Sequence, residues 1–100
     1  MVTDKILSLL GFASKAGKLS FGVHATEWAI KSGKARLVLA AFDISEKSVK
    51  ELKFKASDKI PVEVLKTVDI DTLSKKVGKS CGIVAINDDG FATALLEQIN

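Results

Sequence analysis

The sequence predicts one domain of the α/β class, folded as a three-layer α/β/α sandwich. The chain has 100 residues, of which 47% are hydrophobic and 27% are charged, and this size and composition suit a single globular core. Segment 35–42 is apolar almost throughout, which is typical of a central strand covered by helices on both faces. Helical and extended patterns alternate along the chain, without repeats, low-complexity tracts or linkers. We therefore expect residues 1–100 to form a single domain.

Two helices precede the central strand. Apolar residues recur at helical spacing after Thr3, whose hydroxyl can cap the first turn, and Gly17 is a natural left-handed stop. Gly33 ends the second helix in the same way. The elements expected in this half are a helix over 4–16, an extended piece over 19–21, a helix over 23–32 and a strand over 35–42.

The second half of the chain continues this alternation. Ser45 is the expected N-cap of the third helix, which has an apolar face and an opposite, solvated face rich in lysine. Either Asp69 or Asp71 caps the fourth helix, and Gly78 ends it. The expected elements are a helix from Ser45 to about residue 57, a strand over 62–65, a helix over 71–77, a strand over 82–86, a turn over 87–90 and a helix over 91–99.

Basic residues are concentrated in the first half of the chain. From Lys5 to Phe42 there are six basic residues and one acidic residue, a charge of +5, whereas the whole chain has a net charge of +3. The remaining residues therefore sum to −2. A basic region of this kind attracts a polyanion, and it surrounds the stretch 17–43, in which a glycine-punctuated turn, a helix and the apolar strand follow one another.

The sequence contains no visible catalytic or metal-binding constellation. Cys81 is the single cysteine and His24 the single histidine, which excludes an internal disulfide and a Cys/His zinc site. These two residues lie far apart in the sequence, which argues against a nucleophile–base pair. Gly78 followed by Lys79 does not form a phosphate-binding P-loop, because Leu73 stands where the first glycine of that motif belongs. We expect a protein that is not an enzyme and that has no cofactor and no metal.

The pattern of apolar residues argues against a membrane protein. The longest apolar run, 37–42, is too short to cross a bilayer, and the first residues lack the order of basic flank, apolar stretch and cleavage site of a secretory signal. A single cysteine also fits a reducing compartment. The expected location is the cytoplasm.

The candidate binding site is the start of the second helix. Backbone amides in the first turn of a helix point outward and favour an anion, and Gly22 lets a phosphate or a base edge approach the backbone closely. Trp28 can stack on an unpaired base or pack into the helix–sheet interface, and the spacing leaves both open. The residues that carry this site are Gly22, His24, Ala25 and Trp28 in the helix, Lys15 and Lys18 before it, and Lys31, Lys34 and Arg36 around its end.

Short motifs spread over the chain carry a family resemblance. They are Gly17-Lys18-Leu19, Gly22, Gly33-Lys34-Ala35, the strand 36–41, Asp43, Ser45 and the late stretch VAINDDGFA at 84–92. Together they resemble the L7Ae/L30e superfamily of ribosomal proteins, and within it the small bacterial branch often labelled YlxQ-like. The resemblance covers nearly the whole chain and keeps the order of the elements. It implies a mixed four-stranded sheet between helices and the binding of RNA kink-turns or related internal loops.

The resemblance also implies which residues contact RNA. In the family, the start of the second helix contacts sheared G·A pairs, and the loop between the fourth helix and the last strand assists. The kink-turn binders carry Asn, Glu and, three positions on, Lys where this chain has His24, Ala25 and Trp28. The positions implied for this chain are Gly22, His24, Ala25 and Trp28, followed by Gly78, Lys79, Ser80 and Cys81.

Two functions are compatible with these residues. The first is a non-catalytic RNA-binding protein, acting as a monomer on ribosomal or another structured RNA, in association with the ribosome or with translation or transcription factors. The second is a protein–protein adaptor that keeps the fold and has lost kink-turn specificity. Ala25 and Trp28 motivate the second function, because an apolar patch at a helix start can serve a protein partner.

Overall fold

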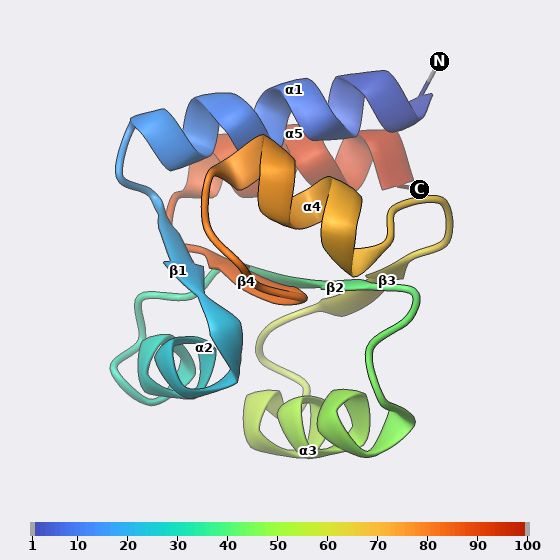
Figure 1. Cartoon of the computed structure of the whole chain (residues 1–100). Helices are drawn as coiled ribbons and strands as arrows, with labels where there is room; N and C mark the ends of the chain where they lie inside the picture. Colours follow the sequence, from blue (N-terminus) through green and yellow to red (C-terminus); the bar gives the residue numbers. More distant parts are fainter. Residues whose placement is uncertain (1, 100) are drawn as a thin grey trace.

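Helices and strands alternate along residues 2–99, the part of the chain that the computed structural model describes (Figure 1). Each boundary lies within two residues of its predicted position, the usual uncertainty at the ends of helices and strands. In order, the elements are α1 (Val2–Lys15), β1 (Leu19–Phe21), α2 (Gly22–Lys31), β2 (Leu37–Ala41), α3 (Glu46–Ala56), β3 (Val62–Leu65), α4 (Ile70–Val77), β4 (Ile83–Ile86) and α5 (Asp89–Ile99).

The four strands form one mixed sheet in the order β1-β4-β2-β3. Strand β4 is antiparallel to both β1 and β2, whereas β2 runs parallel to β3. Figure 1 shows α1, α4 and α5 over one face of this sheet and α2 and α3 over the other. The predicted three-layer α/β/α sandwich with a mixed four-stranded sheet is therefore confirmed.

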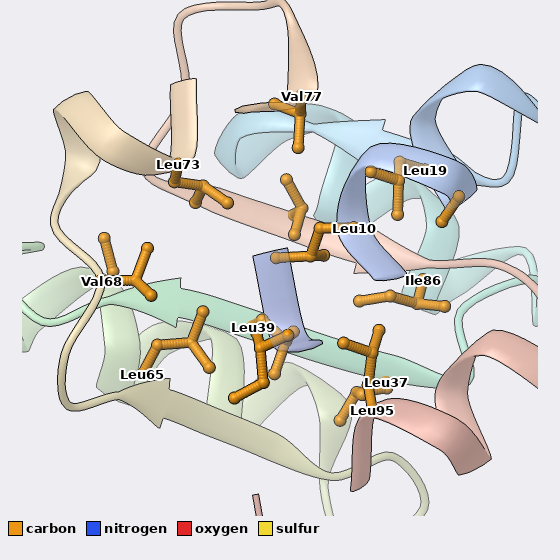
Figure 2. Close-up of a cluster of buried hydrophobic side chains, with 14 of the residues drawn as sticks. Leu10, Leu19, Leu37, Leu39, Leu65, Val68, Leu73, Val77, Ile86 and Leu95 are labelled. Carbon is orange, nitrogen blue, oxygen red and sulfur yellow. The ribbon is translucent and has the colours of Figure 1, made fainter. Parts of the chain in front are cut away.

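The central strand β2 is buried on both faces, as its apolar sequence predicted. Because side chains alternate along a strand, Leu37 and Leu39 point toward α1 and α5, where they join the larger cluster of buried residues (Figure 2). Val38 and Ala40 belong to the second cluster, under α2 and α3. This second cluster consists mostly of alanine, with single leucine, isoleucine and valine residues, so the layer that carries the candidate site rests on smaller side chains.

Two of the predicted N-caps are confirmed. The Ser45 hydroxyl accepts a hydrogen bond from the Ser48 N–H at 3.2 Å, and the Asp69 carboxylate accepts one from the Thr72 N–H at 2.7 Å. Each bond satisfies an amide that the helix itself leaves unpaired. Of the two aspartates considered for α4, Asp69 is the cap and Asp71 lies in the first turn.

The helices α1 and α5 each begin two residues earlier than predicted. The prediction that Thr3 is an N-cap is wrong, because α1 begins before Thr3 and includes it. The Thr3 hydroxyl instead shares a hydrogen bond of 2.6 Å with the Thr67 hydroxyl, a contact that no local pattern indicates. At the other end of the chain, α5 begins at Asp89, within the expected turn, and the Asp88 carboxylate accepts a hydrogen bond from the Phe91 N–H at 2.9 Å.

Candidate nucleic-acid interface

The start of α2 is an open helix N-terminus. The residue before the helix, Phe21, has extended backbone and offers no side-chain hydrogen bond to the first turn. Gly22 has a φ of +88°, and a Cβ added there would meet no atom within 4 Å, so the backbone is accessible from outside. The first amides of α2 therefore receive no acceptor from the cap residue, and the helix dipole favours an anion beside them.

One face of α2 presents three of the predicted residues to solvent. His24, Trp28 and Lys31 are all exposed, and their spacing places them in one line along the helix. The side chain of Trp28 is 68% exposed, whereas Thr26 and Ala29 on the opposite face are buried. Packing of Trp28 into the helix–sheet interface is thereby excluded, and its ring is accessible to a ligand. Ala25, beside this line, is half-buried.

The loop between α4 and β4 has a fixed base and an exposed middle. Gly78 ends α4 in the left-handed conformation, with a φ of +79°. The Ser74 hydroxyl accepts a hydrogen bond from the Cys81 N–H at 3.0 Å and donates one to the Cys81 carbonyl at 2.9 Å. Lys79 and Ser80 are exposed, so the loop presents them to solvent from this fixed base.

The last residues of this loop pack against the end of β2. Cys81 is only 7% exposed, and burial raises the pKa of its thiol, an effect that the nearby Lys79 charge opposes. A thiol that stays protonated is a poor nucleophile, and Cys81 here packs as a small apolar group. The Ala41 N–H donates to the Gly82 carbonyl at 2.8 Å, and a Cβ added at Gly82 would collide with the Ile44 side chain.

A side-chain contact joins the loop to the start of α2. The Lys79 ammonium lies 5.4 Å from the centre of the Phe21 ring, within the range of a cation–π interaction. Phe21 is the last residue of β1 and pairs with Val84 of β4, so the short strand carries the start of α2 to the loop that precedes β4. The two segments that the family resemblance implied are therefore neighbours.

The last turn of α1 lies on the same side of the molecule as this loop. The Ser14 hydroxyl donates a hydrogen bond to the carbonyl of Val77, the last residue of α4, at 2.7 Å. This bond fixes the end of α1 against the base of the α4–β4 loop. Lys15, the next residue, is exposed.

Other predicted basic residues lie at the opposite end of the sheet. The Asn87 N–H donates to the Lys18 carbonyl at 2.8 Å, and the Arg36 N–H donates to the Ile86 carbonyl at 2.8 Å, so both residues flank the end of β4. The α4–β4 loop precedes the start of the same strand. Lys18 precedes β1 and Gly22 follows it. Because β1 is antiparallel to β4, Lys18 lies near the end of β4 and Gly22 lies near its beginning.

The guanidinium of Arg36 is engaged within the protein. Its Nε lies 3.0 Å from Asp89 Oδ1, and its Nη1 donates to the Gly33 carbonyl at 3.0 Å. These bonds tie the segment between α2 and β2 to the start of α5. Lys34 lies in the same segment and is exposed. Lys18 and Arg36 therefore flank the end of β4, whereas the α4–β4 loop and the start of α2 lie near the beginning of that strand.

An ion pair fixes α2 against α3. The Lys55 ammonium lies 2.9 Å from Glu27 Oε2, and the Glu27 side chain is 21% exposed. This hydrogen bond is the main cause that lowers the pKa of Glu27 below its ordinary value, and the charges of Lys55, His24 and Lys31 act in the same direction. The pair joins α2 to α3.

Two negative findings concern the described residues. Among residues 2–99, no three His, Cys, Asp or Glu side chains gather closely enough to hold a metal ion. Within the same part of the chain, no helix combines the length and the apolar character needed to cross a membrane. His24 and Cys81 lie on different elements, α2 and the α4–β4 loop, and differ in exposure, since His24 is exposed and Cys81 is buried.

Most of the chain matches a known protein family. The model described as "Ribosomal protein L7Ae/L30e/S12e/Gadd45 family" matches residues 4–96. The chain belongs to this family. RNA-binding protein YlxQ of Enterococcus faecium is 34% identical to it over 96 residues, which cover 96% of this chain and 92% of that protein. RNA-binding protein YlxQ of Bacillus subtilis (strain 168) is 30% identical and covers 92% of each chain.

Solved structures share the L7Ae/L30e fold of this chain. A protein of unknown function from Bacillus halodurans superposes with a TM-score of 0.88 at 31% identity, over 95% of this chain and 96% of that chain. The 15.5kD RNA binding protein of Giardia lamblia superposes with a TM-score of 0.78 at 19% identity, over 98% and 84% of the two chains, and supports the fold alone. RNA-binding proteins of the L7Ae family are non-catalytic, in agreement with the prediction that this chain is not an enzyme.

Phe21 belongs to this site but was not among the residues predicted from the sequence or from the family resemblance. Phe21 lies under the Lys79 ammonium and directly precedes Gly22. Its signal in the sequence was its position, because it is the last residue of an extended piece that leads into the helix. No pattern within 19–21 shows which loop the aromatic ring will face.

Proposed function

We propose that this chain binds RNA without catalysis and recognises a kink-turn or a related internal loop. The contact surface consists of the start of α2 and the α4–β4 loop. The observation that carries the proposal is the contact between Lys79 and Phe21, which unites the open amides of α2 with a lysine-bearing loop. The description of both YlxQ relatives as RNA-binding proteins supports it.

Main-chain groups and stacking carry recognition in this proposal. The amides beside Gly22 bind a phosphate or a base edge, and Lys79 provides a positive charge close to them. Ala25 has no polar side-chain atom, so the chain forgoes a base contact worth about 1–3 kcal/mol. The exposed ring of Trp28 can stack on an unpaired base, an interaction of about the same size, roughly 1–3 kcal/mol.

We further propose that the protein acts as a monomer in the cytoplasm, on ribosomal or another structured RNA, with the ribosome or with translation or transcription factors. The free thiol of Cys81 fits a reducing compartment. Sedimentation of a cell extract through a sucrose gradient tests the association. We expect the protein in ribosomal fractions at low salt and its release after nuclease treatment. Sedimentation only with free protein would contradict this part of the proposal.

The decisive experiment measures the affinity of the purified protein for a kink-turn RNA at two salt concentrations. A control RNA carries Watson–Crick pairs in place of the sheared G·A pairs. We expect tight binding to the kink-turn and a large loss with the control, because backbone and shape recognition depend on the kinked geometry. Equal and steeply salt-dependent binding to both RNAs would overturn kink-turn recognition and leave only electrostatic attraction.

The exposure of Trp28 beside Ala25 also favours a second candidate, a protein–protein adaptor on the same fold. Exposed aromatic residues are enriched where protein interfaces form. This candidate predicts that a protein partner co-purifies with the chain and remains bound after nuclease treatment. Loss of every partner on nuclease digestion would rule it out and favour RNA.

A further inference from the structure

A second exposed aromatic ring, Phe12, lies on the outer face of α1. Its side chain is 61% exposed, whereas Leu10 and Ala13, on the inner face of the same helix, are fully buried. Beside the ring there is an open hollow of about 320 Å³ between α1 and α4, two helices that lie next to each other over one face of the sheet (Figure 1). The residues that line the hollow are Ser8, Gly11, Phe12, Lys15, Lys75 and Lys76.

Gly11 makes room for the side chain of Lys76. A Cβ added at Gly11 would lie 3.1 Å from Lys76 Cε and 3.9 Å from its Nζ, so the lysine stem crosses the surface of α1 at this glycine. Glycine is unfavourable inside a helix, and the packing of Lys76 gives a reason for its presence. The Lys76 side chain therefore lies along the surface of α1, at the edge of the hollow.

The charge around Phe12 is positive and largely uncompensated. Lys75 forms an ion pair of 3.0 Å with Asp71. Among residues 2–99, no acidic side chain lies within ion-pair distance of Lys15 or Lys76. An exposed aromatic ring between unpaired lysines is typical of surfaces that bind single-stranded nucleic acid. In such a platform the ring stacks on a base and the ammonium groups bind the adjacent phosphates.

This platform adjoins the proposed interface. The hydrogen bond from the Ser14 hydroxyl to the Val77 carbonyl, 2.7 Å long, fixes the last turn of α1 at the base of the α4–β4 loop. The same loop reaches the start of α2 through the contact between Lys79 and Phe21. A strand of RNA that leaves the start of α2 across the loop therefore meets Lys15 first and Phe12 next.

We propose that Phe12, Lys15 and Lys76 bind an unpaired RNA segment that extends from the structured RNA held at the start of α2. The inference rests on the proposed function for its choice of ligand. It adds to that function a preference for RNAs in which one strand continues beyond the folded element as a single strand.

The test compares a blunt kink-turn RNA with two tailed versions, each carrying about six unpaired uridines on one strand end, a length within the range of single-stranded binding sites. We expect one tail to raise the affinity of the wild-type protein about tenfold. Phe12→Ala and Lys76→Gln should remove most of this gain and leave the affinity for the blunt RNA unchanged. For the tailed RNA, Lys76→Gln should also reduce the slope of log affinity against log salt concentration by about 0.7.

The α3 helix, on the other face of the sheet, provides matched controls. Phe54→Ala removes a phenyl ring that is 85% exposed, and Lys50→Gln removes an exposed helical lysine. Both should retain the full gain from the tail. The inference is overturned if neither tail raises the affinity of the wild-type protein, an outcome that would assign the surface to another partner. It is also overturned if Phe12→Ala retains the gain in affinity from the tail. Failure of the proposed function appears separately, as equal wild-type affinity for the blunt kink-turn and its Watson–Crick control.

Discussion

The ammonium group of Lys79 lies 5.4 Å from the centre of the Phe21 ring. These residues are far apart in the sequence, and their contact joins the α4–β4 loop to the junction between β1 and α2. The loop is held at its base by Ser74, and α2 is held against α3 by the ion pair between Glu27 and Lys55. The candidate site therefore consists of two segments with fixed positions and one side-chain contact between them.

Replacement of Lys79 by glutamine should weaken RNA binding roughly tenfold at low salt, the effect of losing one charge-assisted contact of about 1.5 kcal/mol. The slope of log affinity against log salt should fall by about 1, because one phosphate contact is lost. Filter binding or fluorescence anisotropy at several salt concentrations measures both. Lys59→Gln, at an exposed position between α3 and β3, is the matched control and should leave the affinity and the slope unchanged.

The role of Phe21 can be separated from that of Lys79 by a double-mutant cycle. Phe21→Leu keeps an apolar side chain but removes the ring, so Lys79 loses a positioning interaction of about 0.5–1 kcal/mol. We expect the combined loss of RNA affinity in the double variant to be smaller than the sum of the single losses. Strictly additive losses would show that the two residues act independently.

Replacement of Trp28 by alanine should affect binding far more than stability. Because the side chain is 68% exposed, the free energy of unfolding should change by no more than about 0.5 kcal/mol. The loss of base stacking should weaken RNA binding by about 1–3 kcal/mol, roughly 5- to 150-fold. Urea denaturation and RNA titration of the same variant give both values. A large loss of stability with unchanged RNA affinity would contradict the stacking role.

The ion pair between Glu27 and Lys55 should make stability depend on pH. The pKa of Glu27 is lower in the folded protein than its ordinary value, chiefly through the hydrogen bond from Lys55. The pair therefore stabilises the folded state above the ordinary pKa of glutamate, about 4.3, and this contribution disappears as the pH falls through the lowered pKa. Glu27→Gln should lower the free energy of unfolding at neutral pH, with a difference from wild type that narrows in acid.

Urea denaturation at a series of pH values measures this difference. Glu51→Gln removes an exposed carboxylate on α3 and is the control, for which we expect little change in stability at any pH. A Glu27→Gln variant that differs from wild type by the same amount at neutral and at acid pH would show that the ion pair does not account for its effect.

Replacement of Gly82 by alanine should displace the α4–β4 loop. The added Cβ collides with Ile44, and overpacking of this kind typically costs about 1–3 kcal/mol. RNA affinity should fall as well, because the loop that carries Lys79 ends at this glycine. Ile44→Ala opens space for the new methyl group, so the double variant should be more stable than the sum of the two single changes predicts. If the losses of stability in the two single variants simply add in the double variant, the collision with Ile44 is not the cause of the destabilisation by Gly82→Ala.

Local patterns in the sequence predicted the layers of the fold. The run from Leu37 to Ala41 has no polar position, and such a segment is stable only when both faces are covered, which required helices above and below the sheet. The left-handed glycines at 17, 33 and 78 and the caps at Ser45 and Asp69 act within one or two turns, so they could be identified without knowledge of the fold.

Long-range pairing decided the composition of the site. The sequence by itself determined the sandwich and the start of α2 at Gly22 as the candidate site. Only the tertiary structure brought Lys79 to Phe21, placed Lys18 and Arg36 at the other end of the sheet, and exposed the ring of Trp28. The physical reason is that strand order and helix rotation depend on contacts between residues far apart in the chain, which composition, spacing and capping do not encode.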